Sequence, residues 1–307
     1  MKKVWALASL VTGMSMGIAG TLQAGVCSSD GLKNAFLERG EKSFSELTAL
    51  RGEFKSKFDS ASDRDEKIEC ARYIGRLDIL RGGLLPEFEN LNISVDDQKA
   101  AMDDCLAISG EIEETNSPEY HYFYTACLGF RGKLEGLMGR IKYGLMARSA
   151  RGPALEVAQN GGSFEGAGIY RVMSALAGNR MAKPLGLYDS ESALQYANFA
   201  LATPEQPLPP FAGLYSGDSF YENHYYLGQS KIAAGVDQNN KALAEEGNAL
   251  LASKIEEIDL FNEIGELGER KIESLAYQQL MIKLKAKADN CFAGSDWNQC
   301  LIDSLSL

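Results

Sequence analysis

Arg171 is the residue whose type and setting best suit binding chemistry in this chain. It follows Tyr170 at the start of an otherwise apolar stretch, Ile169 to Leu176. A guanidinium group binds a carboxylate through two parallel hydrogen bonds, so one interpretation is a carboxylate clamp. The alternative is a structural arginine that pairs with a helix-end carbonyl or a nearby acid. The sequence leaves both interpretations open.

A second group of candidate residues opens a later helix, expected over 219–234. Successive repeat helices of a solenoid stack side by side, so both groups could face one groove. The predicted ligand-binding residues are Tyr170, Arg171, Tyr221, Asn223 and His224. A pocket of this kind is mostly apolar with few polar groups, which suits a small apolar or carboxylated ligand. Packing is the alternative role for His224 and for the neighbouring aromatic residues.

Catalytic motifs do not accompany these residues. His121 and His224 are the only histidines, and the sequence has no nucleophile-elbow, phosphate-loop, dinucleotide-binding or zinc-protease motif. Carboxylate pairs such as Glu245 and Glu246 are typical of a solvated helix face. We therefore expect a binding or interaction protein, not an enzyme, and no cofactor.

Six cysteines point to three disulfides and an oxidising compartment. Cys105 and Cys127 lie at similar heights on either side of a helix turn expected near 115–118, so they should pair. Cys291 and Cys300 bracket a Gly-Ser-Asp turn and could close a small loop, which leaves Cys27 for Cys70. The spacings lack the short paired pattern of structural zinc sites, so no metal is expected.

Residues 1–24 have the pattern of a secretory signal: Lys2 and Lys3, an apolar stretch to about Gly20, and a small residue, Ala24, at a cleavage point. Val26 is larger than the residue that usually precedes a lipidated cysteine, so simple cleavage is favoured over a lipid anchor at Cys27. The formal net charge is −11, and an acidic protein repels phosphate backbones, so nucleic acid is not expected as a partner.

The rest of the chain, 25–307, predicts a single all-α domain of antiparallel helical hairpins. Helix starts are indicated by caps and acidic first turns, and strand patterns are nearly absent. The helices are expected over 31–58, 63–82, 95–114, 118–147, 165–178, 190–202, 219–234, 238–262 and 269–288, with a short one near 296–303. Within the domain, N-terminal helices (25–147), repeats (164–288) and a C-terminal tail (289–307) are distinguished. Loops are expected at 148–163 and 203–218, the latter with Phe211 and Tyr215.

The segment 165–260 has the pattern of degenerate helical repeats, at best two or three of them. Leu227-Gly228 echoes the Leu-Gly of a tetratricopeptide first helix, and alanines such as Ala193, Ala197 and Ala244 provide small faces for close helix packing. Three elements occur in order: Glu165-Gly166-Ala167-Gly168-Ile169-Tyr170-Arg171-Val172, Pro184-Leu185-Gly186, and Tyr221-Glu222-Asn223-His224-Tyr225-Tyr226-Leu227-Gly228. In these the chain resembles the T component associated with TRAP transporters, a family of tetratricopeptide-like periplasmic proteins.

The resemblance implies a transport-accessory protein that partners a periplasmic substrate-binding protein and holds a small ligand. A different function class stays open, namely a structural helical-repeat scaffold that docks a protein partner without a ligand. A homo-oligomer is compatible with either. A closed aromatic-lined cavity near Tyr170 and Tyr221 would favour the first, and an open groove the second.

Overall fold

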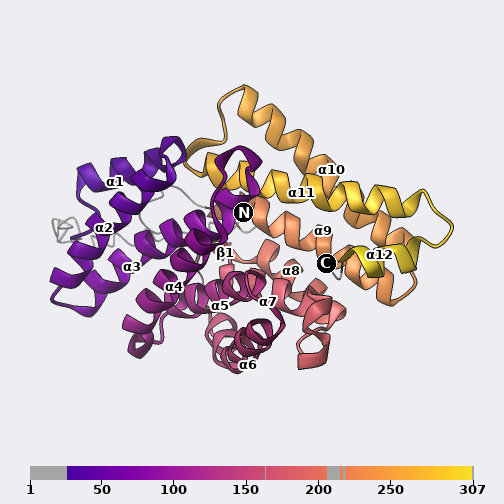
Figure 1. Cartoon of the computed structure of the whole chain (residues 1–307), viewed down its shortest axis with the longest axis horizontal. Coiled ribbons are helices and arrows are strands. Elements are labelled where there is room, and N and C mark those ends of the chain that lie inside the picture. The colour runs from indigo at the N-terminus through magenta and orange to yellow at the C-terminus, as the bar shows by residue number, and fades with distance from the viewer. Residues whose placement is uncertain (1–25, 163, 206–214, 217–218, 306–307) are drawn as a thin grey trace, which may run out of the picture.

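A computed structural model describes residues 26–162, 164–205, 215–216 and 219–305. The fold is all-α, as predicted, and Figure 1 shows the helices packed against one another. Two short strands, β1 (Pro204–Glu205) and β2 (Tyr215–Ser216), pair antiparallel within the predicted proline-rich loop. The expected export signal, 1–24, and Phe211 lie outside the described residues.

Twelve α-helices account for most of the described chain. They are α1 (Asp30–Leu37), α2 (Phe44–Ser60), α3 (Arg64–Ile79), α4 (Val95–Glu111), α5 (Pro118–Lys133), α6 (Leu137–Gln159), α7 (Gly168–Gly178), α8 (Ser190–Ala202), α9 (Tyr221–Asp237), α10 (Lys241–Glu263), α11 (Lys271–Phe292) and α12 (Trp297–Leu305). Short helical turns, η1 (Glu38–Glu41), η2 (Leu80–Leu84) and η3 (Leu85–Glu87), lie between some of them. None of the helices in the described ranges combines the length and apolar character needed to cross a bilayer.

The single helix predicted over 118–147 is wrong, because α5 and α6 share this stretch. α5 ends at Lys133, and Gly136 adopts an extended conformation before α6 begins at Leu137. α6 then runs through the predicted 148–163 linker to Gln159, with Pro153 inside it, so no break occurs at the predicted boundary at 147. The glycines are used partly for packing, since a Cβ on Gly144 would stand 2.3 Å from Leu185 Cδ1.

Two details of α9 also differ from the prediction. α9 begins at Tyr221 and not at 219: it follows Phe220, which has no side-chain cap, and Glu222 in its first turn pairs with Arg270. Asp237 was expected to precede the next helix, but it is the last residue of α9. There it accepts hydrogen bonds from Arg180, Tyr188 and Ser190, while Asn240 caps α10.

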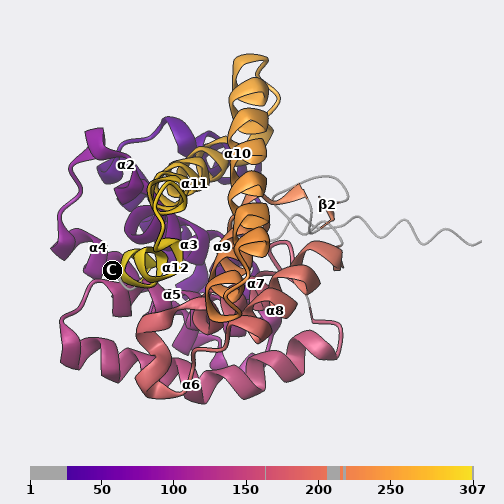
Figure 2. The same cartoon turned by 90° about the vertical axis from the view of Figure 1, so that its right-hand side faces the viewer.

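The helices form two rows. Each helix from α2 to α11 packs against the next one in sequence, and α3, α5, α7, α9 and α11 also pack against one another in that order. We call these five helices the inner row and α2, α4, α6, α8 and α10 the outer row. Figure 2 shows α6 along the lower edge of the molecule and α10 projecting at the top.

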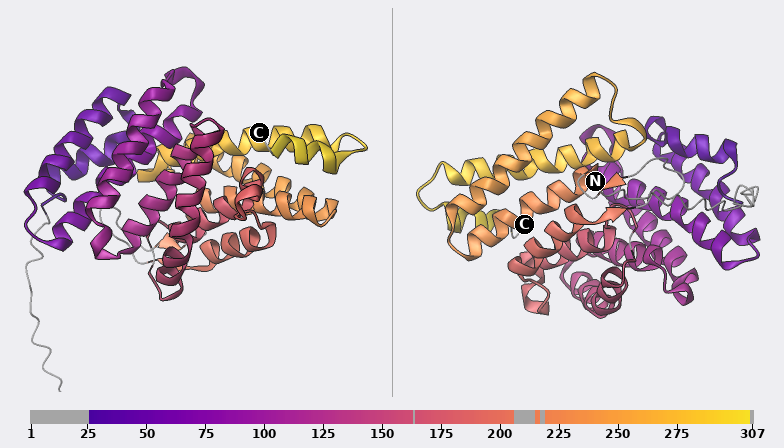
Figure 3. Two further views of the ribbon diagram at one scale, coloured as in Figure 1. Left: turned by 60° about the horizontal axis from the view of Figure 1, so that its bottom comes forward. Right: turned by 180° about the vertical axis from the view of Figure 1, so that it is seen from behind.

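The inner row turns back on itself. α11 packs against α9 and also against η1, η2 and η3 from the first third of the chain. Figure 3 shows the C-terminal helices beside the N-terminal ones in both views. The arginine Arg39 of η1 spans 234 residues to donate to Glu273 of α11, with 2.8 Å between Nε and Oε1. The ends of the fold are therefore joined across its middle.

Small residues set the spacing of the helices, as the alanine faces predicted. Ala193, Ala197 and Ala244 are fully buried. The helices α9 and α10 approach each other closely, since a Cβ on Gly247 would lie 2.6 Å from the carbonyl oxygen of Gly228. Backbones can approach this closely only where no side chain intervenes.

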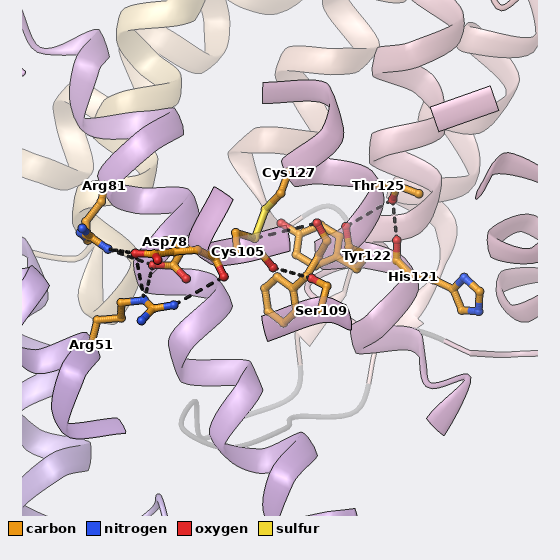
Figure 4. Close-up of a disulfide and its surroundings, with 11 residues drawn as sticks. Arg51, Asp78, Arg81, Cys105, Ser109, His121, Tyr122, Thr125 and Cys127 are labelled. Atoms are coloured by element: carbon orange, nitrogen blue, oxygen red, sulfur yellow. Dashed lines mark hydrogen bonds and ion pairs between the residues drawn. A yellow bond between two sulfur atoms is a disulfide. The ribbon is translucent and has the colours of Figure 1, made fainter. Parts of the chain in front are cut away.

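The three predicted disulfides are present: Cys27–Cys70, Cys105–Cys127 and Cys291–Cys300. Figure 4 shows the Cys105–Cys127 bond joining α4 to α5. Cys27 is completely buried, and its sulfur is bonded to that of Cys70, so it is not available to carry a lipid. Among the described residues no cysteine is free.

Candidate functional site

A cluster of buried polar side chains lies where the inner-row helices meet. Its members come from α3, α5, α7, α9, α11 and the turns before α7 and α11. We call it the central cluster: Arg76, Tyr122, Glu165, Arg171, Glu222, Asn223, Tyr226, Arg270 and Tyr277. Buried charges are costly unless they are paired and hydrogen-bonded, so their arrangement requires an explanation.

Four of these side chains form a chain of alternating charge. Arg76 pairs with Glu165, Arg270 bridges Glu165 and Glu222, and the distance from Arg270 Nη1 to Glu165 Oε2 is 3.1 Å. The guanidinium of Arg270 also lies 4.1 Å from the ring centroid of Phe220. Burial alone would raise the pKa of Glu222, but Arg270 and Arg171 outweigh burial and lower it. These contacts keep the Glu222 carboxylate ionised.

Glu165 lies in the turn before α7, and the backbone conformation of this turn places its side chain between the two arginines. Glu165, Gly166 and Ala167 have φ angles of 57°, 61° and 58°, which is left-handed backbone. Only glycine adopts this conformation freely, so Glu165 and Ala167 are strained. A Cβ on Gly166 would lie 2.3 Å from the Phe220 ring. Such strain persists only where surrounding contacts fix it, here the two arginines on Glu165.

Arg171 differs from the other two arginines of the central cluster. It is 3% exposed, and its guanidinium donates to two neutral oxygens, Asn223 Oδ1 at 3.1 Å and Tyr122 Oη at 3.2 Å. Among the described residues no carboxylate lies within ion-pair distance of it. Glu222 acts on it only from farther away and, with the Tyr122 hydroxyl, contributes to raising its pKa against the effect of burial. Arg171 is therefore a buried cation with neutral hydrogen-bond partners.

Three tyrosines surround this cation. Tyr122, Tyr226 and Tyr277 are each less than a tenth exposed, and Tyr226 and Tyr277 hydrogen-bond to each other. Burial raises the pKa of Tyr226 to about 12 and raises the pKa of Tyr277 well above its usual value, so both hydroxyls carry protons at neutral pH. A guanidinium beside phenol hydroxyls is a donor-rich setting that suits an anionic oxygen.

The structure brings Arg171 and Asn223 together, as expected from the sequence. Asn223 also donates from Nδ2 to the carbonyl oxygens of Gly166 (2.8 Å) and Ala200 (3.3 Å), so it links α9 to α8 and to the strained turn. His224, the next residue of α9, is 9% exposed.

The two remaining predicted residues point toward other helices. Tyr170 stacks on Tyr196 of α8, with ring centroids 6.4 Å apart, and contacts Phe199. Tyr221 donates from its hydroxyl to Glu257 of α10 at 3.0 Å. Both therefore contact outer-row helices, while Arg171 faces the inner row.

Sequence reasoning missed most members of the central cluster. Tyr122, Glu222, Arg270 and Tyr277 were not proposed as site residues. The one usable signal was the presence of charges between apolar neighbours, as with Glu222 before Tyr225-Tyr226-Leu227. Their pairing could not be seen, because Arg270 lies 48 residues from Glu222 and 105 from Glu165.

Two recesses of about 500 Å³ each lie away from the central cluster. One is between the end of α9 and α12, beside Asp237, Trp297 and Asn298. The other is between α1 and α2, beside Leu32 and Glu53. The part of the chain that the structure describes contains no group of three or more His, Cys, Asp or Glu side chains arranged to hold a metal.

Comparison of this chain with protein-family models, with curated proteins and with solved structures finds no match. The central cluster must therefore be interpreted from its own chemistry.

Proposed function

We propose that this chain is an exported helical-repeat protein of the transport-accessory type. In this proposal it pairs with a periplasmic substrate-binding protein and holds a small ligand with an apolar body and a carboxylate. The carboxylate is received by Arg171 within the central cluster, and no catalysis takes place there.

The observation that carries the ligand proposal is the bonding of Arg171. A buried guanidinium has five N–H donors, and here two of its contacts go to neutral oxygens. A ligand carboxylate would add the charge-assisted pair that the cation lacks among the described residues, and the hydroxyls of Tyr122, Tyr226 and Tyr277 could donate to the same anion. The aromatic rings would contact an apolar ligand body.

The order of helix contacts supports a degenerate tetratricopeptide-like solenoid. In such repeats each helix packs on the next, and the first helices of successive repeats line the concave side. The inner row α3 to α11 has this relation, with the central cluster on its facing surfaces. Three disulfides support export, because such bonds persist in oxidising compartments. The transporter partner rests on the sequence resemblance alone.

The ligand proposal is tested with octanoate and octanol, which share an apolar chain and differ in the carboxylate. Native mass spectrometry of gently purified protein shows whether a ligand co-purifies, and calorimetric titration measures octanoate affinity. Arg171→Gln keeps a hydrogen-bonding amide but removes the charge. We expect roughly tenfold to hundredfold weaker octanoate binding and little change for octanol.

Arg131→Gln is the matched control, because Arg131 is a partly exposed arginine paired with Asp103 and Glu135. It should leave octanoate binding unchanged. If nothing co-purifies, and octanoate neither binds nor stabilises the wild type, the ligand proposal is withdrawn.

A scaffold without a ligand is the second candidate, and one observation favours it. Asn223 already uses both N–H groups and its oxygen within the protein, and it holds Arg171 in place. In that case the central cluster only stabilises the packing of the inner-row helices, and a protein partner docks elsewhere. Arg171→Gln would then lower the stability without any effect that depends on octanoate.

A further inference from the structure

The outward face of α6 carries exposed apolar side chains at a corner of the molecule. Leu137 is 75% exposed, Met138 is 77% exposed, and Leu145, two turns later, is 48% exposed. The opposite face of the helix is buried through Ala147, Ala154 and Ala158. Large apolar side chains this exposed on a single face commonly indicate an interaction surface.

The same part of the chain is basic, although the protein as a whole is acidic. Between Arg131 and Arg151 the sequence contains six Lys or Arg residues and one acid, against a formal net charge of −11 for the chain. Arg140, Lys142 and Arg148 are exposed on α6 itself. The one acid, Glu135, is already paired with Arg131 and Lys99, and the next acid along the helix is Glu156.

We propose that the α6 face docks on an anionic phospholipid surface. Leu137 and Met138 enter the headgroup region, while Arg140, Lys142 and Arg148 contact lipid phosphates. A helix with apolar residues on one face and cations beside them lies in the interface plane of a membrane in this way. The net negative charge does not prevent this, because at physiological salt charges more than about 8 Å away are largely screened.

A lipid surface fits these observations better than a protein partner. The two most exposed large apolar side chains that the structure describes, Leu137 and Met138, are consecutive in the first turn of α6. This helix lies along the lower edge of the molecule in Figure 2. An exposed apolar pair with cations on the same helix can enter a fluid headgroup layer without a shaped pocket. A protein partner would need a matching hollow, and a second copy of this chain is an outcome that the experiment detects.

The test is co-sedimentation of the exported protein with vesicles. One set contains one part phosphatidylglycerol to three parts phosphatidylcholine, and the other is phosphatidylcholine alone. The wild type should bind the anionic vesicles, with binding that weakens as salt is added. Leu137→Ser with Met138→Ser should lose binding by about tenfold or more, and Lys142→Gln with Arg148→Gln on the order of tenfold.

The tip of α10 provides a matched control. Leu260 and Ile264 are 53% and 55% exposed but lie among acids, including Asp259 and Glu263. Leu260→Ser with Ile264→Ser should leave vesicle binding unchanged. Equal binding to both vesicle types, no binding at all, or a loss equal to that of the α6 variants would overturn the proposal. So would a concentration-dependent dimer in gel filtration that only the α6 variants lose, because α6 would then dock a second copy.

Discussion

The centre of this molecule and the outer helix α6 invert the usual distribution of side chains in opposite ways. The central cluster buries Arg76, Arg171 and Arg270, whereas α6 holds Leu137 and Met138 out in solvent. Each arrangement costs free energy in isolation. In the centre, Glu165 and Glu222 offset the cost of burying Arg76 and Arg270, while Arg171 is hydrogen-bonded to the neutral side chains of Asn223 and Tyr122. On α6 nothing in the described chain covers Leu137 and Met138, so the central side chains have partners within the protein and these two do not.

Removing a charge from the centre should have the largest effect. Arg270→Met leaves Glu165 and Glu222 buried with one fewer cation, and breaking a buried pair in this way typically costs about 3–5 kcal/mol. Urea denaturation with the disulfides intact measures the change. The exposed pair Lys285–Asp289 is the control, and Lys285→Met should cost less than about 1 kcal/mol. Equal effects would show that the central charges are not coupled to stability.

Opening the Cys105–Cys127 disulfide should come next in size. This bond fixes α5, which carries Tyr122 into the centre, against α4. The double Cys105→Ser, Cys127→Ser variant should lose about 2–4 kcal/mol, since a loop in the unfolded chain is released. Thiol titration of the denatured, unreduced wild type should find no free thiol. Two or more accessible thiols there would remove the basis of the prediction.

The glycine contact between α9 and α10 should have an intermediate effect. In Gly247→Ala the new Cβ meets a backbone oxygen 2.6 Å away, and α9 carries Glu222 and Asn223, so overpacking should cost about 1–3 kcal/mol. Gly129→Ala in α5 meets nothing within 4 Å. It should stabilise by up to about 1 kcal/mol through helix propensity. Thermal melts should show a lower melting temperature for Gly247→Ala and a higher one for Gly129→Ala. This difference is expected if the α9 and α10 backbones are in contact at Gly247.

His121 tests how burial alone changes a pKa, because burial is the cause of its shift. Burial lowers the pKa of His121, whose Nε2 lies 2.7 Å from Asn116 Oδ1. The folded protein therefore favours the neutral imidazole ring. As the pH falls below about 6.5, the unfolded chain binds a proton at this histidine more readily than the folded protein does, so the free energy of unfolding decreases. His121→Gln should make the stability less steep between about pH 7 and pH 5. An unchanged slope would contradict the prediction.

Replacing the exposed Leu137 and Met138 of α6 should have the smallest effect on stability. Leu137→Ser with Met138→Ser removes side chains that are three-quarters exposed, so the free energy of unfolding should change by less than about 0.5 kcal/mol. Urea denaturation checks this. A loss comparable to that of Arg270→Met would mean that the α6 face is part of the core after all.

The all-α class, most helix starts and the disulfides could be predicted from the sequence because their signals are local. Asp63, Ser94 and Ser117 cap α3, α4 and α5, at or directly before the expected helix starts at 63, 95 and 118. The division between α5 and α6 was missed, because the apolar pattern continues across Gly136 and suggests one helix. Pro153 suggested a loop, yet it lies within α6.

The site was only half predictable. Arg171 and Asn223 were placed together because the repeat puts their helices side by side. The charges that complete the cluster, Glu165, Glu222 and Arg270, come from distant parts of the sequence. Nothing near Arg270 indicates that its partners lie in α9 and before α7, since pairing at that distance depends on the whole course of the inner row.

The return of α11 to the first third of the chain also constrains the order of folding. Arg39 can pair with Glu273, and Glu165 with Arg270, only when the C-terminal third of the chain is present. Because the chain is synthesised from its N-terminus, the Cys27–Cys70 and Cys105–Cys127 disulfides can form before the C-terminal third is present. The central charges stay open to water until residue 270 arrives. Contacts this distant in sequence are formed slowly. Two of the three disulfides therefore join segments that lie within the first 127 residues, whereas the central ion pairs require the C-terminal third of the chain.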